Sequence, residues 1–172
     1  MNLPEKIVTE RLIIRPFCQQ DLEGYLDFMT NEEATRYLNF TAEQKTADGA
    51  KALFDFVVAS YTSENPIFAY VIALQDNTFI GSCGISELDG PEIVECYYSL
   101  QPDHWRQGYA TEATQALIRH CFEADSIKEV RAYMSPDNPA SARVAEKVGM
   151  TYLGIQKHPL FENEGKAYAI KK

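Results

Sequence analysis

The residues best suited to chemistry lie where a glycine-containing loop runs into a helix. The segment from Leu100 to Ala113 reads Leu-Gln-Pro-Asp-His-Trp-Arg-Gln-Gly-Tyr-Ala-Thr-Glu-Ala, and Gly108 precedes its helical part. The first backbone N–H groups of a helix have no partner within it, and the helix dipole adds partial positive charge there. Gly108 lets the main chain approach a bound group closely. The segment therefore predicts an anion site, although most such junctions only turn the chain.

A second strand-to-helix junction follows about thirty positions later, at Asn138-Pro139. Asparagine is a favoured N-cap and proline fits the first helical position, so capping alone explains both residues. Ser141 lies in the first turn of that helix, and Gly149 is placed to end it in the left-handed conformation. The pairing of two such junctions indicates one ligand shared between them.

Glu95 interrupts an otherwise apolar run from Ile93 to Tyr98. Side chains of a strand alternate between its faces, so Glu95, Tyr97 and Ser99 point the same way. A carboxylate in apolar surroundings is a candidate general base. The alternative is that Glu95 faces solvent, as most glutamates do.

Composition limits the class of protein. The 172 residues include 25 Asp or Glu and 16 Lys or Arg, for a net charge of -9, and 45% are hydrophobic. These values exclude a disordered, collagen-like or coiled-coil chain and predict one domain over residues 1–172. The acidic balance argues against binding of nucleic acid or of an anionic membrane. No apolar run approaches the roughly 20 residues of a membrane span.

The cysteines and histidines show no metal-ligand spacing. We expect reduced, mostly buried thiols in a cytoplasmic protein, at Cys18, Cys83, Cys96 and Cys121. Met1 to Ile7 does not resemble a signal peptide.

The predicted elements alternate in type, which indicates a mixed α+β fold. Strands are predicted over 9–17, 68–74, 79–85, 93–100 and 128–134, with two more in 152–170 around Asn163-Glu164-Gly165. Asp76-Asn77 and Asp89-Gly90 predict the hairpin turns of an antiparallel meander.

Helices are predicted between these strands. One begins near Leu22, and a further turn or two is expected over 31–38. Others begin after the capping box Thr41-x-x-Gln44, after Pro102 and after Asn138. We expect Ala140, Val144 and Val148 to form the apolar stripe of the last one.

Two motifs together resemble a known family. Trp105-Arg-Gln-Gly-Tyr-Ala-Thr-Glu-Ala113, with Asn138-x-x-Ser141 and Gly149-Met150, resembles the GNAT superfamily of N-acetyltransferases. Thr9-Glu-Arg-Leu-x-x-Arg-Pro16, followed by Asp21-Leu22, is similar to the branch with ribosomal-protein-alanine, spermidine and antibiotic N-acetyltransferases. The resemblance covers about Thr9 to Tyr168. It implies a mostly antiparallel sheet flanked by helices and splayed between its fourth and fifth strands, with acetyl-CoA in the split.

The resemblance also implies binding roles. The pyrophosphate would be held by the N–H groups of Arg106, Gln107, Gly108, Tyr109, Ala110 and Thr111. The backbone of Ser99 and Leu100 would pair with the pantetheine arm, and Asn138 would bond it from the other wall. Tyr37 and Tyr97 are candidate acceptor-pocket residues, and ordinary core packing is the alternative for Tyr37.

The catalytic expectations include one departure from the family pattern. Many relatives carry a tyrosine general acid where this chain has Ala145, so Ser141 is the candidate to assist the departing thiolate. Glu95 is the candidate base. Trp105 stands where the superfamily usually has Gln or Arg, and tryptophan there is common in this branch.

The expected activity is transfer of acetyl from acetyl-CoA to a primary amine, directly and without a metal. The acceptor would be a protein N-terminus or a small amine such as a polyamine or antibiotic, and the enzyme a monomer or homodimer. The acidic excess would favour a cationic acceptor. The alternative is a non-catalytic acyl-CoA-binding regulatory domain on the same fold.

Overall fold

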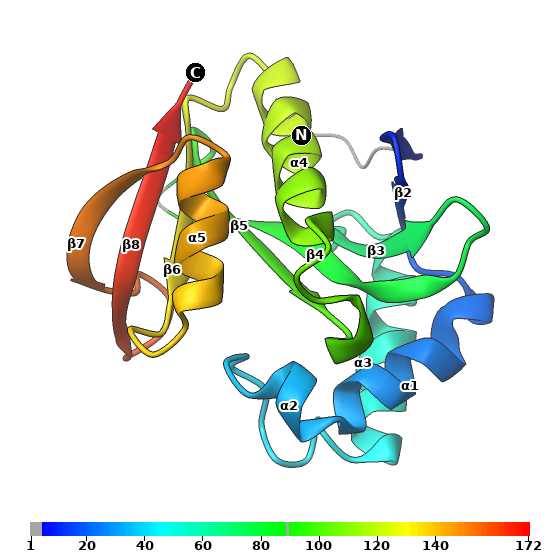
Figure 1. Ribbon diagram of the computed structural model, residues 1–172. Coiled ribbons are helices and arrows are strands. Elements are labelled where there is room, and N and C mark those ends of the chain that lie inside the picture. Colours follow the sequence, from blue (N-terminus) through cyan, green and yellow to red (C-terminus); the bar gives the residue numbers. More distant parts are fainter. Residues whose placement is uncertain (1–4, 89) are drawn as a thin grey trace.

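A twisted eight-stranded sheet organises the chain (Figure 1). The computed structural model describes residues 5–88 and 90–172. The spatial order is β1-β2-β3-β4-β5-β6-β8-β7, and neighbours are antiparallel except β5 and β6, which are parallel. The strands are β1 Ile7–Val8, β2 Leu12–Arg15, β3 Ala69–Leu74, β4 Phe79–Glu87, β5 Ile93–Leu100, β6 Glu129–Met134, β7 Thr151–Lys157 and β8 Glu164–Lys171. The mixed, mostly antiparallel architecture is as predicted.

Helices cover both faces of this sheet. They are α1 Leu22–Thr30, α2 Glu32–Thr35, α3 Ala47–Ser60, α4 Tyr109–Glu123 and α5 Pro139–Lys147, with short 3-10 turns at Gln19–Asp21 and Pro102–His104. The alternation of β3 separates two cores: Tyr70 and Ile72 pack with α4 and α5, whereas Val71 packs with α1 and α3. Among the described residues, no helix has both the length and the apolar character that a membrane span requires.

The sheet opens between β5 and β6. The two strands pair with each other from Ile93 opposite Glu129 to Glu95 opposite Arg131. Beyond that point both strands continue, but no longer pair with each other. On its other edge β5 stays paired with β4 as far as Leu100 opposite Gly81. In Figure 1, β6, β8, β7 and α5 therefore stand apart from β2 to β4. This is the split that the family resemblance implied.

The start of the chain differs from the sequence prediction. The strand expected over 9–17 is a hairpin of β1 and β2, because Thr9 turns the chain: its hydroxyl accepts from Leu12 N at 2.9 Å. Pro16 ends β2, as predicted. Arg15 and Asp21 then join β2 to α1 through two hydrogen bonds of 2.7 and 2.9 Å. These contacts explain why the opening motif carries an arginine and an aspartate at this spacing.

The capping box at Thr41 forms, but it does not start α3. Thr41 N donates to Gln44 Oε1 at 2.9 Å, and Gln44 N donates to Thr41 Oγ1 at 3.2 Å, around a separate turn. The helix begins at Ala47, where Thr46 accepts from Gly49 N. A Cβ on Gly49 would meet the Glu43 carbonyl at 2.0 Å, so the glycine allows the turn to lie against the helix.

The end of the chain brings two further corrections. The predicted turn at 163–165 is wrong, because the loop spans 158–163 and β8 begins at Glu164. The stripe predicted for α5 is wrong at two of its three residues: Val148 is buried as predicted, but Ala140 and Val144 line a cleft, and Ala142 and Ala145 are buried in their place. The predicted turn at Asn77 is confirmed, with φ of 69°. Asp89 of the other predicted turn lies outside the described residues, as do residues 1–4.

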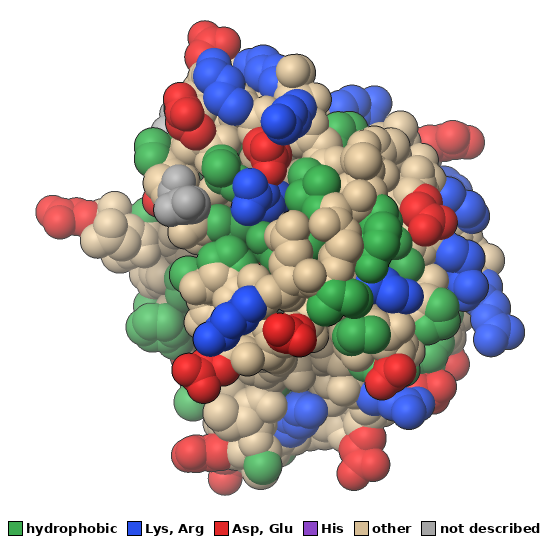
Figure 2. All heavy atoms as spheres, turned by 90° about the vertical axis from the view of Figure 1, so that its left-hand side faces the viewer, with side chains coloured by type: hydrophobic (Ala, Val, Ile, Leu, Met, Phe, Trp, Pro, Cys, Tyr) green, Lys and Arg blue, Asp and Glu red, His purple; other side chains and the backbone are tan. Residues whose placement is uncertain are grey.

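The side of the molecule where β7 lies carries a mixed surface (Figure 2). Hydrophobic side chains there are interspersed with Lys, Arg, Asp and Glu. Exposed apolar residues on β7 are Tyr152, Leu153 and Ile155. Charges around an edge strand oppose its pairing with another chain.

Candidate active site

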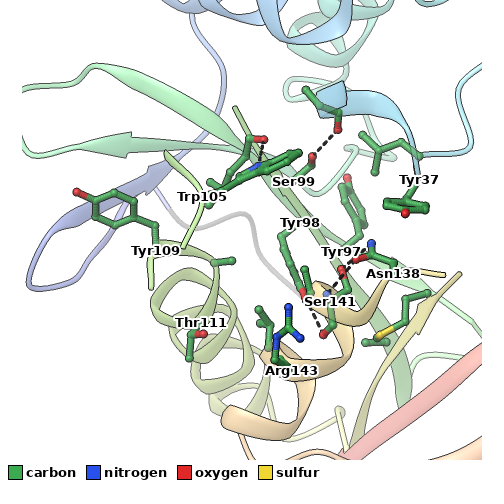
Figure 3. A pocket seen from close by; sticks show the side chains of 18 of the residues that line it. Tyr37, Tyr97, Tyr98, Ser99, Trp105, Tyr109, Thr111, Asn138, Ser141 and Arg143 are labelled. Carbon is green, nitrogen blue, oxygen red and sulfur yellow. Dashed lines mark hydrogen bonds between the residues drawn. The ribbon is translucent and has the colours of Figure 1, made fainter. Parts of the chain in front are cut away.

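A cleft of about 450 Å³ occupies the split between β5 and β6 (Figure 3). Its walls come from the end of β5, the loop before α4, the end of β6 and the first turns of α5. The two strand-to-helix junctions singled out in the sequence therefore face one space, although about thirty residues separate them. Each wall contributes a different kind of group.

The loop before α4 supplies backbone donors. Arg106 and Gly108 both adopt the left-handed conformation, with φ of 61° and 86°, and Gly108 is the N-cap of α4. Arg106, Gly108, Tyr109, Ala110 and Thr111 line the cleft. Free N–H groups at the start of a helix of this length form a site for phosphate oxygens. Gln107 is not a lining residue, and its side chain donates to Asp103 O at 3.0 Å.

The opening motif of the chain fixes this loop from behind. Glu112, in the first turn of α4, accepts from Thr9 Oγ1 and from Arg11 Nε, both at 2.7 Å. Arg11 also donates to Gln107 O at 2.9 Å, and its guanidinium lies 4.6 Å from the centre of the Tyr109 ring. Burial raises the pKa of Glu112, but the bonds from Thr9 and Arg11 outweigh it and leave that pKa below its ordinary value. Local sequence gave no signal for these contacts, because Thr9 and Arg11 lie 103 and 101 positions from Glu112.

We expect Glu112→Gln to raise the Kd for acetyl-CoA about tenfold, the effect of losing one charge-assisted hydrogen bond. The substitution would weaken the contacts that hold the loop without replacing any residue that lines the cleft. Isothermal titration checks this, with Glu123→Gln at the exposed end of the same helix as the control. An unchanged Kd would mean that the loop keeps its shape without the anchor.

Three basic side chains line the cleft near this loop: Arg106, Arg143 and Lys147. Arg143 and Lys147 lie one turn apart on α5, and Figure 3 shows Arg143 reaching from α5 toward the cleft. Positive charge thus gathers locally in a chain whose net charge is -9. The sequence analysis missed Arg143 and Lys147, although their spacing of four on a helix starting at Asn138 was a usable signal.

The backbone of β5 faces the cleft at alternate residues. Leu88 N donates to Ile93 O at 3.1 Å, and Gln101 N donates to Ile80 O at 2.8 Å. In an antiparallel pair this pattern repeats every second residue, so the N–H and C=O of Ser99 point toward β4. Tyr98 and Leu100 direct theirs to the cleft instead. Ser99 therefore does not fit its expected backbone role, and Leu100 O already accepts from Trp105 Nε1 at 2.8 Å.

The side chain of Ser99 lies on the face of the sheet that α2 covers. Its hydroxyl donates to Ala34 O, in α2, at 3.2 Å. This contact helps hold the N-terminal helices against the open part of β5. Ser99 lines the cleft by its side chain rather than by its amide.

Asn138 and Ser141 form a small hydrogen-bonded unit at the start of α5. Asn138 Oδ1 accepts from Ser141 N, and Asn138 Nδ2 donates to Ser141 Oγ, both at 3.1 Å. The N-cap expected from the sequence is confirmed. Because Ser141 Oγ accepts this bond, its own hydroxyl hydrogen is free to point into the cleft, which Ser141 lines.

Tyr37 crosses the mouth of the cleft. Its hydroxyl donates to Asp137 O at 2.8 Å, which ties the segment after α2 to the loop before α5. Tyr37 and Tyr97 both line the cleft, as expected of acceptor-pocket residues (Figure 3). Tyr37 is 41% exposed, so core packing does not account for it.

Glu95 does not line the cleft; it lies next to Cys96, the first residue of β5 that does. It is 9% exposed, so the alternative that it faces solvent is wrong. Burial raises the pKa of Glu95, and the neighbouring His158 offsets only part of that rise. His158 Nε2 lies 2.9 Å from Glu95 Oε2. Local sequence gave no signal for this contact, because 63 positions separate the two residues.

A family profile described as "Acetyltransferase (GNAT) domain" matches residues 11–151, which include both junctions and Glu95. The chain belongs to the GNAT family of acetyltransferases. It is therefore an acetyltransferase enzyme, and the resemblance drawn from its motifs is confirmed.

Known GNAT proteins match most of the chain. The "Uncharacterized N-acetyltransferase YoaA" of Bacillus subtilis (strain 168) is 27% identical over 156 residues, covering 90% of this chain and 88% of YoaA. Spermidine N-acetyltransferase from Vibrio cholerae, in complex with CoA and spermine, aligns with a TM-score of 0.76 at 17% identity, covering 95% of this chain and 96% of that one. RimL, a ribosomal L7/L12 alpha-N-protein acetyltransferase in complex with coenzyme A, aligns with a TM-score of 0.79 at 19% identity. The alignment covers 97% of this chain and 98% of RimL. Both solved structures share the GNAT fold.

Proposed function

We propose that this GNAT enzyme binds acetyl-CoA in the cleft between β5 and β6 and transfers its acetyl group directly to a primary amine. One observation carries the proposal: the cleft has backbone donors and basic side chains at the loop before α4, and its lining on β5 begins at Cys96, next to the buried carboxylate of Glu95. The donor set suits a polyanion, since Arg106, Arg143 and Lys147 stand beside the free N–H groups of α4.

The shape of the split supports one orientation of the donor. With its phosphates at the loop before α4, the pantetheine arm would run back along β5 toward the last β5–β6 pair at Glu95. The cleft-facing N–H and C=O groups of Tyr98 can bond the amides of that arm, as a further strand would. The thioester would then lie near Cys96 and Tyr97. Glu95 is about 7 Å along the strand from Tyr97.

The chemistry requires the ammonium to lose two protons, one before it attacks and one as the amide forms, and the thiolate to gain one. Glu95 would accept the ammonium proton, directly or through a water molecule. The free amine attacks the thioester carbonyl, the C–N bond forms, and the C–S bond breaks. As the C–S bond breaks, the Ser141 hydroxyl gives its proton to the departing sulfur and takes up the second proton of the nitrogen. Glu95 then releases the first proton to solvent. Binding both reactants in one cleft supplies much of the rate.

The acid limb of the pH profile should report Glu95. Burial raises its folded-state pKa, so the carboxylate needed as base is lost already above pH 4.5, the ordinary value for glutamate. We expect kcat/KM to fall on acidification with an apparent pKa clearly above that value. A profile that is flat down to pH 4.5 would remove Glu95 from the rate-limiting proton transfer.

The acceptor is proposed to be a cationic small amine or a protein N-terminus. The spermidine N-acetyltransferase and RimL structures represent these two classes. The net charge of -9 favours a cation through long-range attraction.

An acceptor screen tests the function, with acetyl-CoA as donor and release of free thiol as readout. Polyamines, aminoglycosides and peptides with free N-termini form the panel. We expect turnover with a cationic amine that slows as salt rises. Acetyl-CoA binding in a titration without thiol release from any amine would instead favour the non-catalytic regulatory domain.

We also propose a cytoplasmic enzyme that acts as a monomer or homodimer, without metal, nucleic acid or membrane. The thiols Cys18, Cys83, Cys96 and Cys121 are free, which suits a reducing compartment. Among the described residues, no group of three His, Cys, Asp or Glu side chains is arranged to hold a metal.

A further inference from the structure

The loop between β7 and β8 buries a histidine against Glu95. His158 is 6% exposed and lies at the start of this loop, which is closed by a bond from His158 N to Asn163 O of 2.9 Å. Its ring lies between Tyr133 of β6 and Phe161 of the loop, with ring centres 4.7 Å away on each side. These neighbours restrict rotation of the imidazole.

The hydrogen bonds of His158 define its protonation. Leu160 N donates to Nδ1 at 3.0 Å, so Nδ1 is an acceptor and carries no hydrogen. The ring hydrogen of the neutral imidazole then lies on Nε2, which faces Glu95 Oε2 at 2.9 Å. An imidazolium would set an N–H of the ring against the N–H of Leu160. Both nitrogens are thus engaged, and neither is available to take a proton from substrate.

Arg131, the charged residue opposite Glu95, has partners of its own. Arg131 lies opposite Glu95 in the β5–β6 register, but its guanidinium binds Glu129 at 2.5 Å and Tyr133 Oη at 3.5 Å. Other titratable side chains on β5 and around the loop include Cys96, Tyr97, Tyr98, Lys157 and Glu162. Among the described residues, no donor bonds the second carboxylate oxygen of Glu95, Oε1. The side chain of Glu95 keeps 12% of its surface exposed.

We propose that His158 is a positioning residue for the base: its Nε2–H holds Glu95 Oε2, so that Oε1 is presented to the acceptor amine. The inference rests on the proposed role of Glu95. The bond favours the carboxylate over the carboxylic acid, because Nε2–H donates a stronger hydrogen bond to the charged oxygen than to a neutral carboxyl. It also couples the base to the conformation of the loop between β7 and β8.

Two variants of His158 test this role. His158→Phe removes the donor and leaves Glu95 buried without a partner. We expect kcat to fall about tenfold or more, the acid limb of kcat/KM to move to higher pH, and the Kd for acetyl-CoA to stay unchanged. His158→Gln keeps an N–H near the Nε2 position, so kcat and the acid limb should return toward wild type. An unmoved acid limb in His158→Phe, or no rescue by glutamine, would overturn the inference.

Glu95→Gln separates this inference from the proposed function. If Glu95→Gln loses activity while His158→Phe matches wild type, only the role of His158 fails. If Glu95→Gln is fully active, the assignment of the base itself fails. His158→Phe combined with Glu95→Gln should be no less active than Glu95→Gln alone.

A measurement on the unmodified protein does not depend on whether the variants fold. The ¹⁵N chemical shifts of the His158 ring should identify Nε2 as protonated and Nδ1 as unprotonated at neutral pH. A signal for an imidazolium, or for the Nδ1–H form, would contradict the proposal.

Discussion

Glu95→Gln is expected to lower kcat by about 10²- to 10⁴-fold, the usual contribution of a general base. Glutamine has the size of glutamate but cannot accept the ammonium proton. Glu95 makes no contact with the loop before α4, so the Kd for acetyl-CoA should stay at its wild-type value. Steady-state kinetics on the best acceptor of the screen, together with titration of acetyl-CoA, measure the two effects separately.

Glu92→Gln is the matched control for this experiment. Glu92 lies three residues earlier, is exposed, and precedes β5. Its kcat should be unchanged. A loss of less than about threefold in Glu95→Gln would show that the amine loses its proton to another group or to solvent.

Asp21→Asn is expected to destabilise the fold by about 3 kcal/mol, the cost of breaking a buried ion pair on one side. Asp21 is 2% exposed and accepts two bonds from Arg15 and one from Cys18 N at 2.8 Å. The variant leaves the Arg15 guanidinium without its carboxylate between β2 and α1. Urea denaturation at pH 7 measures the change, with Asp55→Asn in the exposed pair with Lys51 as control.

The effect of Asp21→Asn should depend on pH in one direction. Burial raises the pKa of Asp21, but the bonds from Arg15 and Cys18 outweigh it and hold that pKa below 3.8. A carboxyl whose pKa is lower in the folded state stabilises the protein at any pH above its unfolded-state pKa. That stabilisation is lost as the pH falls through the folded-state pKa. The difference between wild type and variant should therefore shrink below about pH 4. A difference that stays constant to pH 2 would contradict the ion-pair explanation.

Local patterns predicted the elements and the two ends of the cleft. Strand alternation placed Glu95, Tyr97 and Ser99 on one face, and capping chemistry placed Asn138 and Gly149 at the ends of α5. Each of these predictions depends on neighbours within a few residues, where backbone geometry limits the choices.

Contacts between distant segments could not be predicted in this way. The 101 positions between Arg11 and Glu112 and the 63 between Glu95 and His158 carry no periodic signal. The stripe predicted for α5 is correct at Val148 but wrong at Ala140 and Val144, which line a cleft. Hydrophobicity alone does not distinguish a cleft wall from a core. The backbone role of Ser99 came from the family resemblance, which gives a position in the strand but not the edge to which its amide points.

The alternation of β5 assigns donor contacts and acceptor contacts to different residues of one strand. In the proposed complex, even-numbered residues offer backbone groups to the donor, while the side chains of Val94, Cys96 and Leu100 are buried in the core. Odd-numbered residues offer side chains to the opposite face, where Glu95 and Tyr97 lie. Substitutions at odd positions can thus alter the acceptor without weakening the donor contacts. Insertion or deletion of one residue in β5 would exchange the two sets and disrupt both. A change in the length of this strand should therefore disrupt the donor and acceptor sites together, whereas a substitution at an odd position affects only the acceptor side.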